Sequence, residues 1–146
     1  TRTPVRTITR QQGTVRRISV SGDGRWAATA GEDQRIRLWN LEDGTPGPVL
    51  PGYTGGGPAL SFDGRIVAGS VENRICVWDL ETGLLVRTFE GHSEPPDFVR
   101  LSRDSATMVS AGRDGTLRRW ILDWELEERQ TPAEREQPCC TSTTPL

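Results

Sequence analysis

Hydrophobic and polar residues alternate in short runs along this chain, and turn-forming residues separate the runs. The segments "VRRISV" (15–20), "RWAATAG" (25–31) and "IRLWNL" (36–41) are rich in β-branched, aromatic and small residues. Asp23-Gly24 separates the first two segments, and Asp43-Gly44 follows the third. Short runs with such turn formers between them predict β-strands joined by antiparallel hairpins, and they leave no room for helices.

The same pattern occurs three times, and a tryptophan near the end of each unit marks it. Trp39, Trp78 and Trp120 are 39 and 42 residues apart, and an acidic residue stands six positions before each. The repeat includes the start of the chain, since "PVRTITRQ" (4–11) aligns with "LVRTFEGH" (85–92). Outer strands are therefore predicted over 4–9, around 47–51 and over 84–89. An all-β array of four-stranded antiparallel sheets, with about 40 residues each, is typical of β-propeller blades.

The three units resemble the repeats of the WD-repeat β-propeller family. The family's Gly-His pair corresponds to Gly91-His92. Its Trp-Asp pair corresponds to Trp78-Asp79, and to Trp39-Asn40 and Trp120-Ile121 in altered form. The resemblance covers about residues 4–124, and the last unit is similar to the C-terminal blades of bacterial WD-repeat proteins.

The resemblance implies an incomplete ring of about three blades within residues 1–124. Its units are expected over about 4–44, 45–83 and 84–124. Residues 125–146 are expected to form an acidic exit segment and a disordered tail, because they are poor in large apolar residues. An open arc of blades leaves two apolar faces in water. We therefore expect either further blades from a longer chain or self-association.

One unit contains His92, Ser110 and Asp114, and these three residue types also form the catalytic triad of many hydrolases. In the family that the chain resembles, the same residues and Trp120 form a structural network. Its hydrogen bonds run from the indole to the hydroxyl, the imidazole and the carboxylate. No nucleophile elbow accompanies the serine.

The other two units support the structural interpretation. The first unit has Thr29, Asp33 and Trp39, with Gln11 at the position of the histidine. The second unit retains Glu72 and Trp78, with Ala68 at the position of the hydroxyl. A catalytic triad is expected once in a protein, whereas a structural hydrogen-bond network is expected in every blade and can be incomplete in some of them. We therefore expect no catalytic residue and no enzymatic activity.

Composition narrows the function further. Eighteen basic and twenty acidic side chains give a net charge of −2, whereas a nucleic-acid-binding protein usually carries a basic stripe. No apolar run approaches the roughly 18 residues that a membrane span needs. With a single histidine, no set of metal ligands has a known spacing. The glycine-rich "GYTGGGPAL" (52–60) lacks the Lys and Ser/Thr of a phosphate-binding loop, so no cofactor is expected.

The cysteines and the basic residues bear on the source and the compartment. Three cysteines do not make a disulfide framework, and Cys76 lies in an apolar run, where a small buried hydrophobe is expected. This usage fits a reducing compartment, so we expect a cytoplasmic protein. All eighteen basic residues are Arg, which favours a GC-rich, bacterial source.

The fold class favours a non-catalytic protein–protein interaction scaffold. In the family that the chain resembles, partners bind the face that carries the loops entering each blade and the loops before each third strand. On this chain that face would include Gln34, Arg35, Tyr53, Asn73, Arg74 and Arg113. Arg and Tyr are favoured at interfaces, so a protein or peptide is the expected partner. The alternative is a sensor or regulatory module of a bacterial signalling protein, with a kinase or a nucleotide-hydrolysing switch upstream.

Overall fold

The computed structural model describes residues 6–9, 13–51 and 56–122. Eleven β-strands and no helix occur in these ranges, as the alternation of short runs predicts. In this part of the chain there is accordingly no helix long and apolar enough to cross a membrane.

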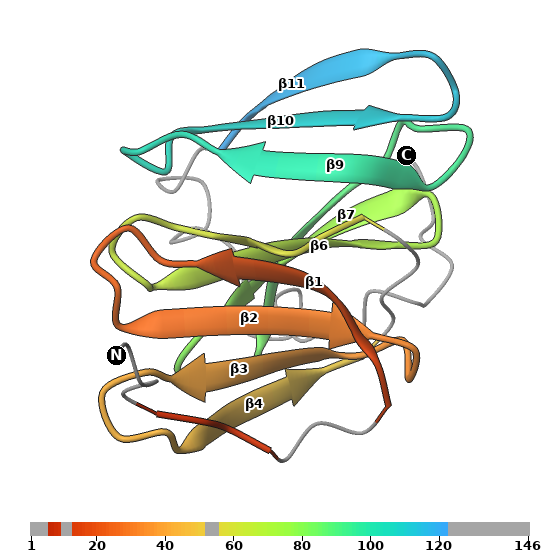
Figure 1. Cartoon of the computed structure of the whole chain (residues 1–146). Helices are drawn as coiled ribbons and strands as arrows, with labels where there is room; N and C mark the ends of the chain where they lie inside the picture. Colours follow the sequence, from red (N-terminus) through yellow and green to blue (C-terminus); the bar gives the residue numbers. More distant parts are fainter. Residues whose placement is uncertain (1–5, 10–12, 52–55, 123–146) are drawn as a thin grey trace, which may run out of the picture.

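The strands form three antiparallel sheets, which we call blades 1, 2 and 3. Blade 1 consists of β1 (Val15–Val20), β2 (Trp26–Gly31), β3 (Ile36–Asn40) and β4 (Pro46–Leu50). Blade 2 consists of β5 (Ala59–Leu60), β6 (Ile66–Val71), β7 (Arg74–Asp79) and β8 (Leu85–Phe89). Blade 3 consists of β9 (Pro96–Leu101), β10 (Thr107–Gly112) and β11 (Leu117–Ile121). Sequential strands are neighbours in every sheet, and Figure 1 shows the sheets stacked with blade 2 in the middle. The predicted open arc of blades is confirmed.

Two hydrophobic clusters hold the blades together, one at each interface. Between blades 1 and 2 the cluster consists of Ala28, Ala30, Ile36, Leu38, Leu50, Leu60, Val67, Val71, Cys76, Trp78 and Leu80. Between blades 2 and 3 it consists of Ala59, Ala68, Ile75, Val77, Val99, Met108 and Leu122. Successive side chains of a strand point to opposite faces, so β6 and β7 supply residues to both clusters. Blade 2 is therefore apolar on both faces, as the continuous small and apolar runs of its sequence predict.

Cys76 lies in the first cluster and is completely buried, as expected. Its sulfur is in a disulfide, which differs from the unpaired thiol suggested by the sequence. The reducing compartment and the cytoplasmic location stay predictions.

The first hairpin of each blade is closed by the same Ser-x-Asp turn. The hydroxyls of Ser21, Ser61 and Ser102 donate to the carboxylates of Asp23, Asp63 and Asp104 at 2.6, 2.8 and 2.6 Å. Neighbouring turns also touch each other. The Asp23 N–H donates to the Phe62 carbonyl oxygen at 3.0 Å, and the Arg103 guanidinium lies 4.3 Å from the centre of the Phe62 ring. These contacts connect all three blades at the edge opposite to the loops expected to bind partners.

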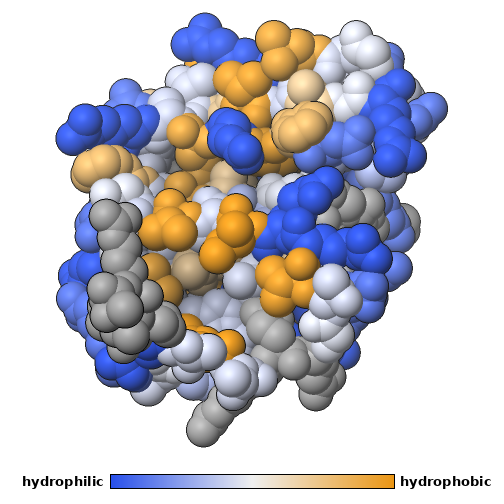
Figure 2. All heavy atoms as spheres, viewed as in Figure 1, coloured by the Kyte–Doolittle hydropathy of each residue, from blue (hydrophilic) through white to orange (hydrophobic). Residues whose placement is uncertain are grey.

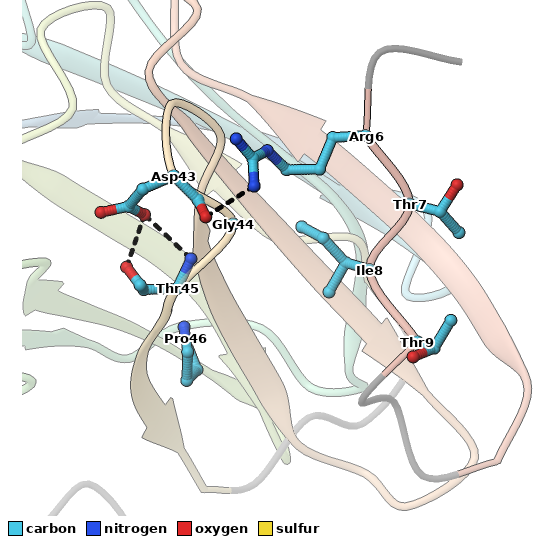
Figure 3. Close-up of a pocket in the computed structure, with 8 residues that line it drawn as sticks. All are labelled: Arg6, Thr7, Ile8, Thr9, Asp43, Gly44, Thr45 and Pro46. Carbon is cyan, nitrogen blue, oxygen red and sulfur yellow. Dashed lines mark hydrogen bonds between the residues drawn. The ribbon is translucent and has the colours of Figure 1, made fainter. Parts of the chain in front are cut away.

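Residues 6–9 depart from the prediction, because they do not form a strand. They lie beside the turn between β3 and β4, as Figure 3 shows. There the two terminal nitrogens of Arg6 donate to the carbonyl oxygens of Asp43, at 2.8 Å, and Glu42, at 3.0 Å. The outer strand predicted over 4–9 is therefore wrong in its described part. The exit segment and tail predicted over 125–146 lie outside the described residues.

Candidate functional site

The predicted network in blade 3 is present as an unbroken chain of hydrogen bonds. The Trp120 Nε1–H donates to Ser110 Oγ at 2.8 Å, and Ser110 Oγ lies 2.7 Å from His92 Nε2. His92 Nδ1 lies 2.7 Å from Asp114 Oδ2. A carboxylate can only accept here, so the imidazole donates from Nδ1 and accepts the Ser110 proton at Nε2. Each polar atom of this corner thus has a partner of the opposite kind.

Asp114 receives more hydrogen bonds than any other member of the network. The Thr116 hydroxyl donates to its carboxylate at 2.7 Å, and the N–H groups of Thr116 and Ser93 donate at 3.0 and 3.2 Å. The Thr116 hydroxyl bond is the main cause that holds the pKa of Asp114 well below its usual range, and the Thr116 N–H, His92 and Ser93 bonds add to it. The carboxylate therefore stays ionised and joins the loop before β9 to the turn between β10 and β11.

This geometry does not suit Ser110 as a nucleophile. Ser110 is 1% exposed, and its hydroxyl accepts a hydrogen bond from Trp120 and donates one to His92. A nucleophilic serine needs an open position beside its oxygen and donors for the oxyanion. The arrangement is that of a rigid corner that satisfies buried polar groups.

Blade 1 repeats part of the corner. The Trp39 Nε1–H donates to Thr29 Oγ1 at 2.9 Å, as in blade 3. Asp33 forms an ion pair with Arg37 and accepts the Arg35 N–H at 3.3 Å, so it orders the turn between β2 and β3. Gln11, predicted at the position of the histidine, lies outside the described residues.

Blade 2 requires a correction, because Ala68 does not occupy the position of the hydroxyl. The register pairs Val67 with Trp78 and Gly69 with Cys76, which places Gly69 where Thr29 and Ser110 stand in the other blades. Ala68 points to the opposite face, into the cluster shared with blade 3. Glu72 lies in the exposed two-residue turn between β6 and β7, with a φ of 53°. Trp78 is thus held by packing, without a hydroxyl partner in the described part of its blade.

The predicted partner-binding residues lie on the turns between β2 and β3, β6 and β7, and β10 and β11. We call this side of the blades the loop edge; two of its turns, β2 to β3 and β10 to β11, lie at the right of Figure 1. Gln34 and Arg35 are exposed on the first turn, and Gln34 has a φ of 59°. Asn73 Nδ2 donates to the Ser93 carbonyl oxygen at 3.0 Å and links blades 2 and 3. Tyr53 lies outside the described residues.

Several arginines at or beside the loop edge form ion pairs that no local pattern of the sequence indicates. Arg74 pairs with Glu90 at 3.0 Å, and Arg113 pairs with Asp97 at 3.4 Å. In a third pair the places are reversed, because Arg16 of β1 pairs at 2.7 Å with Glu32 of the turn between β2 and β3. The partners come from strands, turns and loops that the fold brings together, so only a predicted register could have indicated them. Arg35 differs, because its guanidinium has no partner among the described residues.

The described residues offer little to a small ligand or a metal ion. A pocket of about 270 Å³ lies between residues 6–9 and 43–46, and the Arg6 guanidinium is bound there by backbone carbonyls (Figure 3). Within the described ranges, no group of three or more His, Cys, Asp or Glu side chains is placed to hold a metal ion.

The corner, the four-stranded sheets and the spacing of the tryptophans define a protein built from WD-type propeller blades. The family model of the WD domain, G-beta repeat, matches residues 2–40 and 83–120, which together make up just over half of the chain. The chain therefore belongs to the WD-repeat family, whose members typically mediate protein–protein interactions. The stretch between the two matched ranges contains most of blade 2, the blade without the hydroxyl.

The chain aligns with parts of two longer proteins. The protein groucho of Drosophila melanogaster is 30% identical over 114 residues, which cover 74% of this chain and 16% of groucho. A solved structure of U3-55K aligns with a TM-score of 0.68 at 21% identity, covering 90% of this chain and 40% of that one. At this identity the likeness to U3-55K shows the fold alone. The chain spans less than half the length of either protein.

Proposed function

We propose that this chain is a non-catalytic platform that binds a protein or peptide at its loop edge. Membership of the WD-repeat family is the observation that carries the proposal. The loop edge supports it, since its turns carry exposed polar side chains on rigid strands.

The contacts of the loop edge reduce the cost of binding. The Asn73 to Ser93 hydrogen bond joins the turn between β6 and β7 of blade 2 to the loop before β9 of blade 3. The Arg113 to Asp97 ion pair holds the turn between β10 and β11 against β9 within blade 3. A surface that is ordered before binding loses less conformational entropy when a partner arrives. Arg35 provides an exposed guanidinium with no partner in the described structure, so it is the side chain best placed to anchor an acidic or carbonyl group.

Selection of peptides from a random displayed library tests this proposal. We expect the full chain to enrich a peptide motif, and Arg35→Glu to weaken binding of that motif roughly tenfold, because it removes a hydrogen-bond donor and adds a repulsive charge. Arg65→Glu is the matched control, since Arg65 is also exposed but lies at the opposite edge of blade 2. Binding that both variants weaken equally, or neither weakens, would argue against the loop edge.

The absence of catalysis needs its own test. Ser110→Ala should lower stability by about 1–3 kcal/mol, because it leaves the Trp120 N–H and the His92 ring nitrogen without their partner. The variant should have the same activity on model esters as the wild-type chain, namely none above buffer. Ser110-dependent ester hydrolysis by the wild-type chain would contradict the proposal. The alternative function, a sensor or regulatory module of a signalling protein, is favoured by no contact among the described residues.

A further inference from the structure

Blade 3 differs from blades 1 and 2 at one position of the face that each blade turns away from its predecessor. The residue before the tryptophan is Leu38 in blade 1, Val77 in blade 2 and Arg119 in blade 3. Leu38 and Val77 are buried under the next blade, whereas Arg119 is exposed. Burying an unpaired guanidinium is costly, so a further blade with the same apolar interface does not fit over blade 3.

This surface, which we call the outer face of blade 3, combines apolar and basic side chains. Its large side chains are those of Phe98, Arg100, Val109, Leu117, Arg119 and Ile121. Leu117 is 75% exposed, although the equivalent residues Ile36 and Ile75 are fully buried. Figure 2 shows hydrophobic and hydrophilic residues side by side over blade 3, at the top of the view.

The two arginines of the outer face stand in one row across the sheet. Val109 pairs with Arg100 on β9 and with Arg119 on β11, so both guanidinium groups flank the same valine. Arg100 donates to the carbonyl oxygen of its neighbour Val99 at 2.9 Å, and neither arginine forms an ion pair with a described acidic residue. An occupant that fits this face therefore brings apolar and acidic side chains together.

The residues that follow β11 in the sequence have this combination. The segment "DWELEER" (123–129), which we call the acidic segment, contains four acidic residues and one basic residue. It also contains Trp124 and Leu126, which are the only large apolar residues between Leu122 and Leu146. The acidic segment lies outside the described residues. Large apolar side chains are thus concentrated in the sequence directly after β11.

The chain leaves blade 3 at a point from which the acidic segment can reach the outer face. Leu122 is buried in the cluster between blades 2 and 3, and its N–H donates to the Ala106 carbonyl oxygen at 2.9 Å. An extended chain spans about 3.3 Å per residue, so the acidic segment can extend over roughly 23 Å, whereas Ile121 and Leu117 are only about 13 Å apart along β11. Because the segment is tethered at Leu122, it binds the face intramolecularly, and a separate molecule has to compete with it.

We propose that the acidic segment folds back over the outer face of blade 3 and covers it. Trp124 and Leu126 then pack on the apolar side chains of the face. The carboxylates of the segment pair with Arg119 and Arg100, whose long apolar stems can lie under the cover while the guanidinium groups stay at its rim. The segment thus shields from water an apolar surface that a further blade does not fit. This contact is separate from the proposed interaction at the loop edge and goes beyond it.

Limited proteolysis of the full chain with a glutamyl endopeptidase tests the proposal, with each cut assigned by mass spectrometry. Glu125, Glu127 and Glu128 lie in the acidic segment, and Glu134 and Glu136 follow it and serve as internal references. A bound segment is cut only while it is detached, so we expect cleavage in the segment to be roughly tenfold slower than at the references. This ratio should not depend on the protein concentration, because the contact is intramolecular.

Two variants of the outer face should release the segment. Arg119→Glu should speed cleavage in the segment roughly tenfold relative to the references, because an attractive charge becomes a repulsive one. Leu117→Thr should speed it to a smaller extent, because it removes apolar contact from the face. Combining Arg119→Glu with Glu125→Arg exchanges the charges and should restore slow cleavage at Glu127 and Glu128. Arg35→Glu, on blade 1, is the matched control and should leave all rates unchanged.

Unfolding curves establish that each variant is folded before the cleavage rates are compared. Equal rates in the wild-type chain, Arg119→Glu and Leu117→Thr would overturn the proposal, whether the segment is cut slowly or rapidly in all three. Protection that increases with the protein concentration would overturn it as well, because the cover would then come from a second copy of the chain. None of these results affects the peptide selection that tests the loop edge.

Discussion

Blades 2 and 3 fix the same tryptophan in two different ways. In blade 3, Trp120 is half-buried, donates to Ser110 and packs against Phe89 with ring centres 5.4 Å apart. In blade 2, Trp78 is 3% exposed and belongs to the cluster shared with blade 1. Gly69 stands where the hydroxyl is found in blade 3, and a Cβ added there would lie 2.6 Å from Ile36 Cδ1. A methyl group of the neighbouring blade therefore occupies the space that the hydroxyl uses elsewhere.

Blade 2 can lack the hydrogen-bonded hydroxyl and histidine of blade 3 because other contacts fix its tryptophan. A central blade has apolar neighbours on both faces, and their packing holds the tryptophan without a hydrogen bond. Among the described residues, blade 3 has a neighbouring blade on one face only, and the hydrogen-bonded corner supplies the rigidity of that blade. The missing hydroxyl of blade 2 thus coincides with an apolar interface between blades 1 and 2, which stabilises the blade in its place.

The largest expected effect is the loss of packing in blade 2. Trp78→Ala should lower the free energy of unfolding by about 3–5 kcal/mol, because it leaves a cavity between blades 1 and 2. Trp120→Ala should cost less, since that side chain is only half-buried. Urea unfolding of both variants measures the difference. A larger loss for Trp120→Ala would mean that the hydrogen-bonded corner, and not the packing, dominates stability.

A smaller effect is expected when a serine is introduced into blade 2 at the position that Ser110 has in blade 3. Gly69→Ser places a side chain against the buried Ile36, and overpacking of this kind costs about 1–3 kcal/mol. Ile36→Val removes the methyl group in question, so the double variant should lose less stability than the two single variants summed. Chemical unfolding of all three variants measures this coupling. Strict additivity would show that Ile36 does not compete with the hydroxyl for the space.

The strands were predictable from the sequence because their pattern is local. The prediction of 36–41 corresponds to β3 at Ile36–Asn40, and that of 84–89 corresponds to β8 at Leu85–Phe89. Alternation and turn residues determine such elements, and neither depends on distant parts of the chain. The network of blade 3 was predictable for a different reason, since the family resemblance supplied its residues.

The errors came from features that depend on register and on contacts between blades. Ala68 precedes Trp78 by ten residues, the same spacing as in the pairs Thr29/Trp39 and Ser110/Trp120. Val71 pairs with Arg74, however, so the turn between β6 and β7 is shorter than the turn between β2 and β3, and the spacing does not hold in blade 2. The segment 6–9 has the sequence of an outer strand, yet its Arg6 is bound by carbonyl groups at another turn. The ion pairs of the loop edge join residues far apart in sequence. Each of these features depends on which residues the fold brings together, and a local sequence pattern does not contain that information.

The smallest expected effect is the pH dependence of the blade 3 corner. The pKa of Asp114 is lower in the folded chain than the value of about 3.9 for a free Asp, chiefly because the Thr116 hydroxyl donates to it. A lowered pKa means that the ionised group stabilises the fold above about pH 4, and that this contribution is lost as the pH falls through the folded pKa. Asp114→Asn lacks the charge, so its deficit in urea midpoint should be largest near neutral pH and should shrink on acidification.

Asp104→Asn is the matched control for this titration. Asp104 is in the same blade, and its pKa is also lowered, chiefly by the Ser102 hydroxyl, but it lies in the exposed turn between β9 and β10. It accepts hydrogen bonds from fewer groups than Asp114, so its deficit at neutral pH should be smaller. Midpoints measured from pH 7 down to the acid transition compare the two variants. A deficit for Asp114→Asn that does not change with pH would show that the corner depends on the shape of the side chain and not on its charge.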